Sequence, residues 1–461
     1  MYWLKISCML CMFGCFKDFR PSESFLTDYL TGPWKNFTAD QVNHEIYPVT
    51  TYCYSLTLIL MFLITDFIRY KPIIILCGLS GVITFLLIPL GRIVLVLQIS
   101  KFFFGLFMSA EVAYYTYIYA KVDRVHYQEV TSHTKAASLF GRSMSGIVAQ
   151  LTASFHLLNY HQLNYLTLSA FIIATFWSLF LPSVGHSIYF HSDKCDDISD
   201  DEENSNATVQ TTNQSQQVLS NSRKSRDKSS KTKPGTLFHK IKNAYALLWK
   251  HFVLAYTNYR VIKWSAWWAL STCGYLMVAT YSQLLWQTAV KPGDMIYNGA
   301  VDFAYAILGA VMVFSVGKIP FNWVRFGDPV CSVFAFVEGS ILLMSSYSYN
   351  IWALYAGYIV FGAIYHTMVT VASFEVAKCI SDDSHGLIFG VNIFLALLLQ
   401  SLLTLIVVNT IMLDIRQQFL VFSSYFMALA MIYIVLSVIN ILRYRRIANF
   451  VEINGINQRE I

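Results

Sequence analysis

Charged side chains are scarce in this chain. Asp, Glu, Lys and Arg make up 13% of its 461 residues, whereas 56% of the residues are hydrophobic and 16% are aromatic. A typical soluble domain carries about 25% charged residues. The composition therefore excludes an ordinary soluble domain and predicts a protein that lies in a lipid bilayer. We expect no nucleic-acid partner.

Motifs of catalysis and metal binding are missing as well. The sequence has no paired catalytic carboxylates, no His-Glu-x-x-His motif and no Gly-x-Ser-x-Gly motif, which argues against an enzyme. It shows no Gly-rich phosphate loop. Its nine cysteines form no paired set of Cys-x-x-Cys motifs and no external disulfide framework. We therefore predict a protein without enzymatic activity, cofactor or metal.

Long apolar stretches dominate the sequence instead. A hydrocarbon core of roughly 30 Å needs about 20 apolar residues per helix. Twelve stretches meet or approach that length, six on each side of a polar middle stretch. This layout is typical of a secondary transporter. The predicted spans are residues 3–26, 46–67, 72–90, 93–120, 137–158, 165–184, 261–285, 297–316, 328–347, 351–377, 387–409 and 419–442.

The predicted fold class is all-α, a polytopic membrane protein with twelve transmembrane helices in a six-plus-six arrangement. Residues 1–184 are predicted to form an N-terminal half and residues 257–443 a C-terminal half, with 444–461 as a cytoplasmic tail. Residues 185–236 run from an acidic to a basic cluster with little hydrophobicity, which predicts a disordered cytoplasmic linker. Residues 237–256 place apolar side chains on a helical period among lysines, which predicts an amphipathic helix on the inner membrane surface.

Basic residues in the short loops predict the orientation in the membrane. Twelve Lys and Arg residues lie in loops after even-numbered spans and in the tail, against four on the opposite side. Both termini are therefore predicted to be cytoplasmic. The sequon Asn36-Phe37-Thr38 then falls in the first external loop, where Asn36 is a candidate glycosylation site.

Ionisable side chains at membrane depth are costly, so each of them is a functional candidate. In the fourth predicted span the residues at 101, 104, 108, 111 and 115 fall within an arc of roughly 80° on a helix. This stripe predicts the wall of a cavity. An internal ion-pair lattice, for instance Glu111 with Arg142, remains an alternative. The candidates in the spans are Glu23, Lys101, Glu111, Arg142, Asp302, His366 and Glu375.

Polar residues also line faces of three spans in the second half. Asn298 and Asp302 lie one turn apart in the eighth predicted span, and Asn392 and Gln400 contribute amides to the eleventh. Hydrogen bonds between helices explain most such groups, and a lone histidine is more often structural than a ligand. Asp302 of the eighth span and His366 of the tenth span remain the stronger functional candidates.

Several segments of the chain form long motifs. They are Arg20-Pro21-Ser22-Glu23-Ser24-Phe25-Leu26-Thr27, Gly32-Pro33-Trp34-Lys35-Asn36-Phe37-Thr38, Thr65-Asp66-Phe67-Ile68-Arg69-Tyr70-Lys71-Pro72, Ala110-Glu111-Val112-Ala113-Tyr114-Tyr115, His126-Tyr127-Gln128, Trp267-Trp268-Ala269-Leu270, Tyr297-Asn298-Gly299-Ala300-Val301 and Phe389-Gly390-Val391-Asn392. These segments resemble the reduced folate carrier and thiamine transporter family. The similarity extends over all twelve predicted spans and is absent from the middle stretch and the tail. It implies a major-facilitator fold in the plasma membrane that carries a water-soluble vitamin by alternating access, coupled to a proton or an exchanged anion.

The two branches of that family differ in the charge of their substrates. Folates are anions that call for cationic partners, whereas thiamine is a cation that calls for carboxylates and aromatic faces. The folate branch has basic residues at the positions that align with His366 and Gln400, which this chain lacks. Glu111 and Gln400 match the thiamine branch. The resemblance thus favours thiamine slightly, with folate as the alternative and a non-transporting vitamin sensor as a second alternative.

Three positions depart from the thiamine branch. That branch has an aromatic residue at Thr50, a carboxylate at Lys101 and a tyrosine at Phe104. A lysine in place of the carboxylate is expected to repel a cation, so Glu23 is the acidic position that best keeps the family pattern. The predicted substrate-binding residues are Glu23, Thr50, Lys101, Phe104, Glu111, Tyr115, Asn298, Asp302, His366 and Gln400.

Overall fold

The computed structural model describes residues 2–68, 70–122, 126–183, 252–291, 294–318, 322–380 and 385–454, together with residues 246, 249 and 250. Every regular element within these ranges is helical. The predictions for the linker 185–236, for most of the segment 237–256 and for the end of the tail fall outside the described residues.

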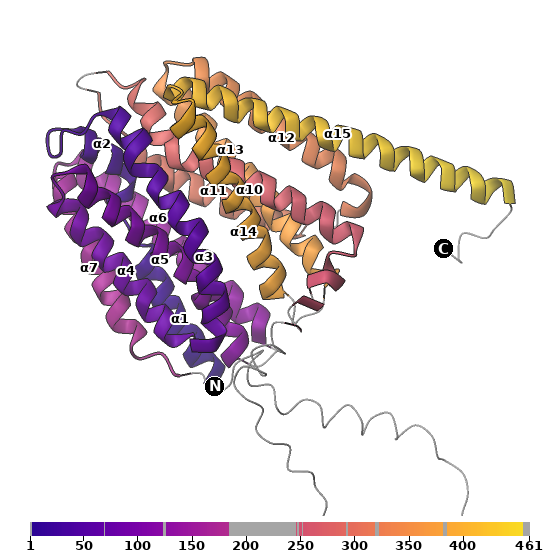
Figure 1. Cartoon of the computed structure of the whole chain (residues 1–461), viewed down its shortest axis with the longest axis horizontal. Helices are drawn as coiled ribbons and strands as arrows, with labels where there is room; N and C mark the ends of the chain where they lie inside the picture. Colours follow the sequence, from indigo (N-terminus) through magenta and orange to yellow (C-terminus); the bar gives the residue numbers. More distant parts are fainter. Residues whose placement is uncertain are drawn as a thin grey trace, which may run out of the picture.

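Long helices form two blocks that lie side by side, one from each half of the sequence (Figure 1). Polar loop residues separate the helices, and the apolar runs between them form the helices themselves. The N-terminal half contains α1 (Tyr2–Asp18), α2 (Leu26–Thr31), α3 (Tyr47–Ile68), α4 (Lys71–Leu90), α5 (Val94–Lys121), α6 (Tyr127–Ser154) and α7 (Tyr160–Ser178). The C-terminal half contains α10 (Tyr259–Gln287), α11 (Asn298–Lys318), α12 (Trp323–Tyr347), α13 (Ile351–Ala377), α14 (His385–Leu403) and α15 (Ile415–Asn454).

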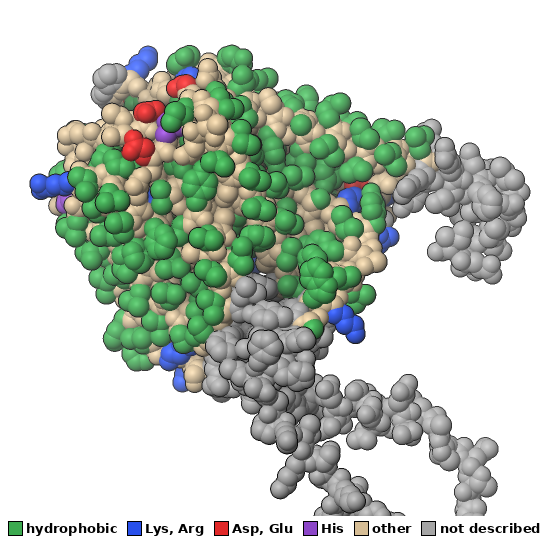
Figure 2. All heavy atoms as spheres, viewed as in Figure 1, with side chains coloured by type: hydrophobic (Ala, Val, Ile, Leu, Met, Phe, Trp, Pro, Cys, Tyr) green, Lys and Arg blue, Asp and Glu red, His purple; other side chains and the backbone are tan. Residues whose placement is uncertain are grey.

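Each predicted span has a helical counterpart in the structure, but several ends differ. The helix α6 begins at Tyr127, well before the predicted start at residue 137, and α15 continues to Asn454. Hydropathy marks only the apolar part of a helix, so polar turns at its ends were missed. Seven of the described helices are apolar and long enough to cross a membrane by those two criteria alone. Figure 2 shows a broad band of hydrophobic side chains over both halves, as a lipid-facing surface requires.

The prediction of one continuous first helix is wrong. The helix α1 ends at Asp18, the chain turns through residues 19–22, and a single 3₁₀ turn (Glu23–Phe25) leads into α2. Pro21 explains the break, because proline has no N–H group and disfavours helical backbone in the residue before it.

Side chains of two neighbouring helices satisfy the backbone of this break. The Arg20 N–H donates to the Ser145 hydroxyl of α6 at 3.1 Å, and the Ser22 N–H donates to the Thr167 hydroxyl of α7 at 3.1 Å. The Thr167 hydroxyl donates in turn to the Ser22 hydroxyl at 2.9 Å. Non-helical backbone in the middle of a membrane protein persists only where such partners replace the lost helical bonds.

The two halves meet along α6 and α11 and along α3 and α14. At the first of these contacts the backbones touch, since a Cβ atom on Gly146 would lie 2.7 Å from the Gly299 carbonyl oxygen. A larger residue at either glycine would push the halves apart.

Several polar bonds between the halves lie on one side of the described bundle. We call this side the loop face, because it carries the connection of residues 32–40, and it lies opposite the N-terminus (Figure 1). Asp28 accepts from Gln287 at 2.9 Å and from Asn298 at 3.2 Å, and the Tyr52 hydroxyl donates to Asn409 at 3.1 Å. The described structure is therefore closed at its loop face.

The hydroxyl of Thr167 should contribute measurably to stability. We expect Thr167→Val to lower the free energy of unfolding by about 1–3 kcal/mol, because the Ser22 N–H is then left buried without a partner. Thermal unfolding of the purified protein in detergent measures this loss. Ser169→Ala is the control, since Ser169 is exposed on the same helix and its hydroxyl bonds only within α7. Equal melting temperatures for the two variants would show that the break does not depend on Thr167.

Candidate functional site

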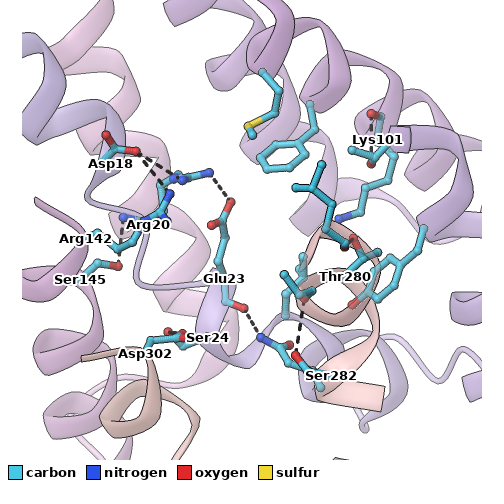
Figure 3. Close-up of a pocket in the computed structure, with 18 of the residues that line it drawn as sticks. Asp18, Arg20, Glu23, Ser24, Lys101, Arg142, Ser145, Thr280, Ser282 and Asp302 are labelled. Carbon is cyan, nitrogen blue, oxygen red and sulfur yellow. Dashed lines mark hydrogen bonds and ion pairs between the residues drawn. The ribbon is translucent and has the colours of Figure 1, made fainter. Parts of the chain in front are cut away.

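A cavity of about 310 Å³ lies between the two halves, at the level of the break in α1. This is within the usual range for small-molecule sites, roughly 300–1,000 Å³. Polar side chains from the break and from α5, α6 and α11 project towards it (Figure 3). The aromatic side chains that line it are Tyr47, Tyr54, Phe85, Phe104, Tyr275, Trp286, Tyr305 and Tyr358. The cavity can therefore hold a flat, polar molecule.

Three acidic and three basic residues line the cavity, so its formal charge is balanced. What a solute meets depends on which of these charges already have partners inside the protein. The six residues are Asp18, Arg20, Glu23, Lys101, Arg142 and Asp302.

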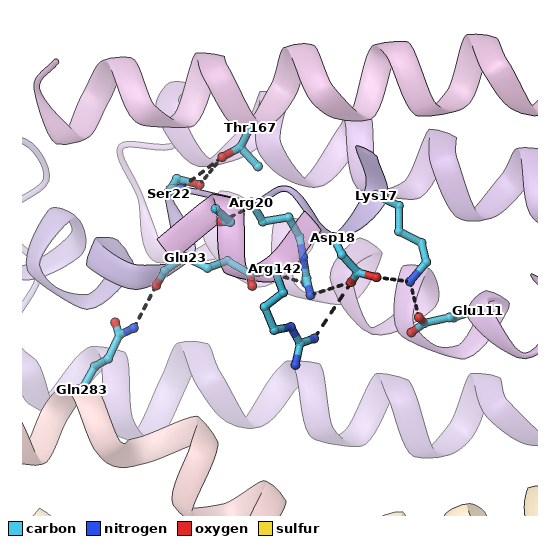
Figure 4. Close-up of polar contacts among 10 residues, drawn as sticks. Lys17, Asp18, Arg20, Ser22, Glu23, Glu111, Arg142, Thr167 and Gln283 are labelled. Carbon is cyan, nitrogen blue, oxygen red and sulfur yellow. Dashed lines mark hydrogen bonds and ion pairs between the residues drawn. The ribbon is translucent and has the colours of Figure 1, made fainter. Parts of the chain in front are cut away.

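A chain of ion pairs surrounds the break in α1 (Figure 4). The Lys17 ammonium group, which is completely buried, pairs with Asp18 at 2.9 Å and with Glu111 of α5. Arg20 pairs with Asp18 at 3.4 Å and with Glu23 at 2.8 Å. The carboxylates Asp18, Glu23 and Glu111 thus each have an ion-pair partner within the protein.

Lys101 differs from these cations because no carboxylate of the described residues lies within 4.0 Å of its Nζ atom. The Nζ atom instead lies 5.0 Å from the centroid of the Tyr47 ring and 5.4 Å from that of the Phe104 ring. Aromatic faces attract a cation but do not neutralise it. Lys101 therefore presents an uncompensated positive charge to the cavity.

Asp302 of α11 lies on the opposite half from Lys101. Its carboxylate accepts a hydrogen bond of 2.6 Å from the Ser24 hydroxyl at the break in α1. A neutral hydroxyl does not cancel the charge of a carboxylate, so Asp302 is the acidic counterpart of Lys101 in the cavity.

The structure brings six of the ten predicted site residues to the cavity. These are Glu23, Thr50, Lys101, Phe104, Asp302 and Gln400. Glu111 and Tyr115 are not among the lining residues. Glu111 pairs with Lys17, not with Arg142 as the lattice alternative proposed, and the Tyr115 ring lies 5.8 Å from the Lys17 Nζ atom.

Asn298 and His366 also lie away from the cavity surface. Asn298 joins the halves at the loop face, where it donates to Asp28 and accepts from the Tyr355 hydroxyl at 2.8 Å. His366 lies behind the wall and bonds the hydroxyl of Tyr305, a lining residue. Both contacts are structural in this conformation.

The sequence carries a local signal for the ion-pair chain. Lys17, Asp18 and Arg20 follow an apolar run directly and precede Pro21. Clustered charges before a proline inside a span are typical of a broken helix with an internal ion pair. The predicted first span, residues 3–26, runs through this cluster without a break.

The sequence of this chain is similar to those of known proteins over most of its length. The family model described as reduced folate carrier matches residues 1–421. Human thiamine transporter 2 is 36% identical over 450 residues, which cover 94% of this chain and 90% of that protein. Folate transporter 1 of Caenorhabditis elegans is 36% identical over 435 residues, covering 94% and 92% of the two chains.

Solved structures show the same arrangement of helices. The nucleoside transporter NupG matches with a TM-score of 0.58 and 15% sequence identity, over 94% of this chain and 98% of that one. At this level of identity the likeness establishes the fold alone, an all-helical arrangement of two blocks that lie side by side.

The pairing of Lys17 makes a prediction about stability. Lys17→Met should cost about 3–5 kcal/mol, because it leaves Asp18 and Glu111 as buried carboxylates without their cation. The double variant Lys17→Met/Glu111→Gln should recover part of that loss, since one unpaired charge is removed. Thermal unfolding and the yield of monodisperse protein measure both effects. A Lys17→Met protein as stable as the wild type would contradict the assignment of Lys17 as the central cation.

Proposed function

We propose that this chain, which belongs to the reduced folate carrier family, carries its vitamin substrate by alternating access of the cavity to the two sides of the membrane. The match to the family over residues 1–421 and the 36% identity to two vitamin transporters support transport as the function. The protein is a membrane transporter and not an enzyme. Its cavity lies between two halves, where rocking of one half against the other exposes a site alternately.

The distribution of contacts between the halves supports this mechanism. The hydrogen bonds of Asp28 and Tyr52 close the described structure at its loop face. These bonds have to break when the cavity opens to that side. We further propose that the protein lies in the plasma membrane with both termini cytoplasmic, so that the loop face is external. Asn36 is exposed on that face, as a glycosylation site must be.

We propose a reduced folate as the substrate, and the observation that carries this is the uncompensated charge of Lys101. A folate has a flat ring system and a glutamate tail with two carboxylates. The ring can stack among tyrosines such as Tyr305 and Tyr358, while a carboxylate pairs with Lys101. This ranking reverses the slight preference for thiamine that the resemblance alone suggested.

Thiamine is the second candidate, favoured by Asp302 and by the identity to human thiamine transporter 2. A cationic ring can lie against Asp302 and the aromatic wall. Two facts weigh against it: Arg20 already neutralises Glu23, and Lys101 repels a cation. The sensor hypothesis differs from both candidates, since a sensor binds its ligand without saturable flux.

Replacing Lys101 tests the substrate. Cells that express the wild type should show saturable uptake of labelled folate, and Lys101→Gln should raise its KM about tenfold or more, because a charged hydrogen bond is worth about 1.5–3 kcal/mol. Lys5→Gln, which changes an exposed lysine of the same half, should leave the KM unchanged. Saturable thiamine uptake without folate uptake, increased in Lys101→Gln, would make thiamine the substrate.

A reversible cross-link tests alternating access. The hydroxyls of Ser55 in α3 and Ser401 in α14 lie 2.6 Å apart across the two halves. Oxidation of a Ser55→Cys/Ser401→Cys variant should join the halves and abolish uptake, and a reductant should restore it. Each single variant, treated with the same oxidant, is the control. Full uptake by the cross-linked protein would show that the halves do not separate here.

A further inference from the structure

Arg142 is the cation that is held least closely in the ion-pair chain. Three cations point at the single carboxylate of Asp18, and they do so at unequal distances. Lys17 lies 2.9 Å from it, Arg20 3.4 Å and Arg142 4.0 Å. The contact of Arg142 is the longest of the three and exceeds the usual length of a charge-assisted hydrogen bond, about 2.7–2.9 Å.

The other carboxylates near the break are not available to Arg142. Glu111 is paired with Lys17, and Glu23 with Arg20 at 2.8 Å. Among the described residues, Asp18 supplies the one ion pair that Arg142 makes. The cations Lys17, Arg20 and Arg142 are therefore equal in number to the carboxylates Asp18, Glu23 and Glu111. Because of their geometry, the guanidinium group of Arg142 makes the longest of these ion pairs.

Arg142 also differs from Arg20 and Lys17 in the exposed fraction of its side chain. Its side chain is 41% exposed, whereas that of Arg20 is 7% exposed and that of Lys17 is 0% exposed. Arg142 lines the cavity between the halves, so a solute there can reach its guanidinium group. Figure 3 shows Arg142 on one wall and Lys101 on the other. The cavity therefore has two available cations, on α6 and on α5.

We propose that Arg142 binds one oxyanion group of the solute while Lys101 binds a second, so that the cavity selects solutes with two acidic groups. Asp18 is then a positioning residue, which holds the guanidinium group at the wall until the solute arrives. This inference rests on the proposed transport of a reduced folate and identifies the residue that recognises its second carboxylate.

The chemistry of the two cations suits this division. A guanidinium group offers a planar fork of N–H donors that matches a carboxylate in two parallel bonds, whereas an ammonium group acts as a compact point charge. Asp18 is shared among three cations, so a solute carboxylate can take up the fork of Arg142 without leaving Asp18 unpaired.

The test compares folate with pteroate, which keeps the ring system but has a single carboxylate. KM values for both are measured in cells that express the wild type or Arg142→Gln, with the amount of protein at the surface determined in parallel. We expect Arg142→Gln to raise the KM for folate tenfold or more, relative to its effect on pteroate. Lys101→Gln should raise the KM for folate and the KM for pteroate alike. The matched control is Arg92→Gln, which changes an exposed arginine outside the cavity.

A second variant covers the case in which Arg142→Gln does not reach the surface. Arg142→Lys keeps the charge and loses the fork, so it should weaken folate uptake several-fold while the KM for pteroate stays within twofold of the wild type. Equal changes for folate and pteroate in either variant would overturn the role of Arg142 and leave folate transport standing. A wild type that carries neither compound would overturn the proposed substrate and this inference together.

Discussion

The ion pairs of Lys17 with Asp18 and Glu111 are the interaction on which the rest of the structure depends. A proline breaks the first helix in the middle of the bundle, and the break brings backbone groups and four charges of the segment 17–23 to a depth where water is scarce. Lys17 pairs with two carboxylates at once, and the hydroxyls of α6 and α7 accept hydrogen bonds from the N–H groups that the break leaves free. Without these partners the break would cost more than the fold can tolerate.

The same ion pairs determine what the cavity offers to a solute. Because Glu23 and Asp18 are paired inside the protein, Asp302 is the remaining lining carboxylate without an ion pair among the described residues. Lys101, which faces only aromatic rings, and Arg142, which is held weakly, remain for the solute. A solute in the cavity therefore meets these two cations and the single carboxylate of Asp302. The closed loop face keeps these charges away from one side of the membrane until the halves move.

The sequence predicted the fold class and the two blocks of helices, and six of its ten predicted site residues line the cavity. Apolar runs determine where helices form in a membrane, and the stripe of Lys101 and Phe104 follows from helical geometry alone. The sequence did not predict which charges pair, because Glu111 pairs with Lys17, which lies 94 positions away in the chain. Asn298 and His366 were placed at the site for their polarity, but that polarity serves contacts between helices. The broken helix carried a local signal in Pro21, which was overlooked.

A cryo-electron microscopy structure of the protein with bound folate would test the central claim, that available cations and not carboxylates recognise the solute. The account predicts that one glutamate carboxylate lies within 4 Å of Lys101 and the other against Arg142, with the ring among the tyrosines of the C-terminal half. Folate bound with both carboxylates away from Lys101 and Arg142 would contradict it.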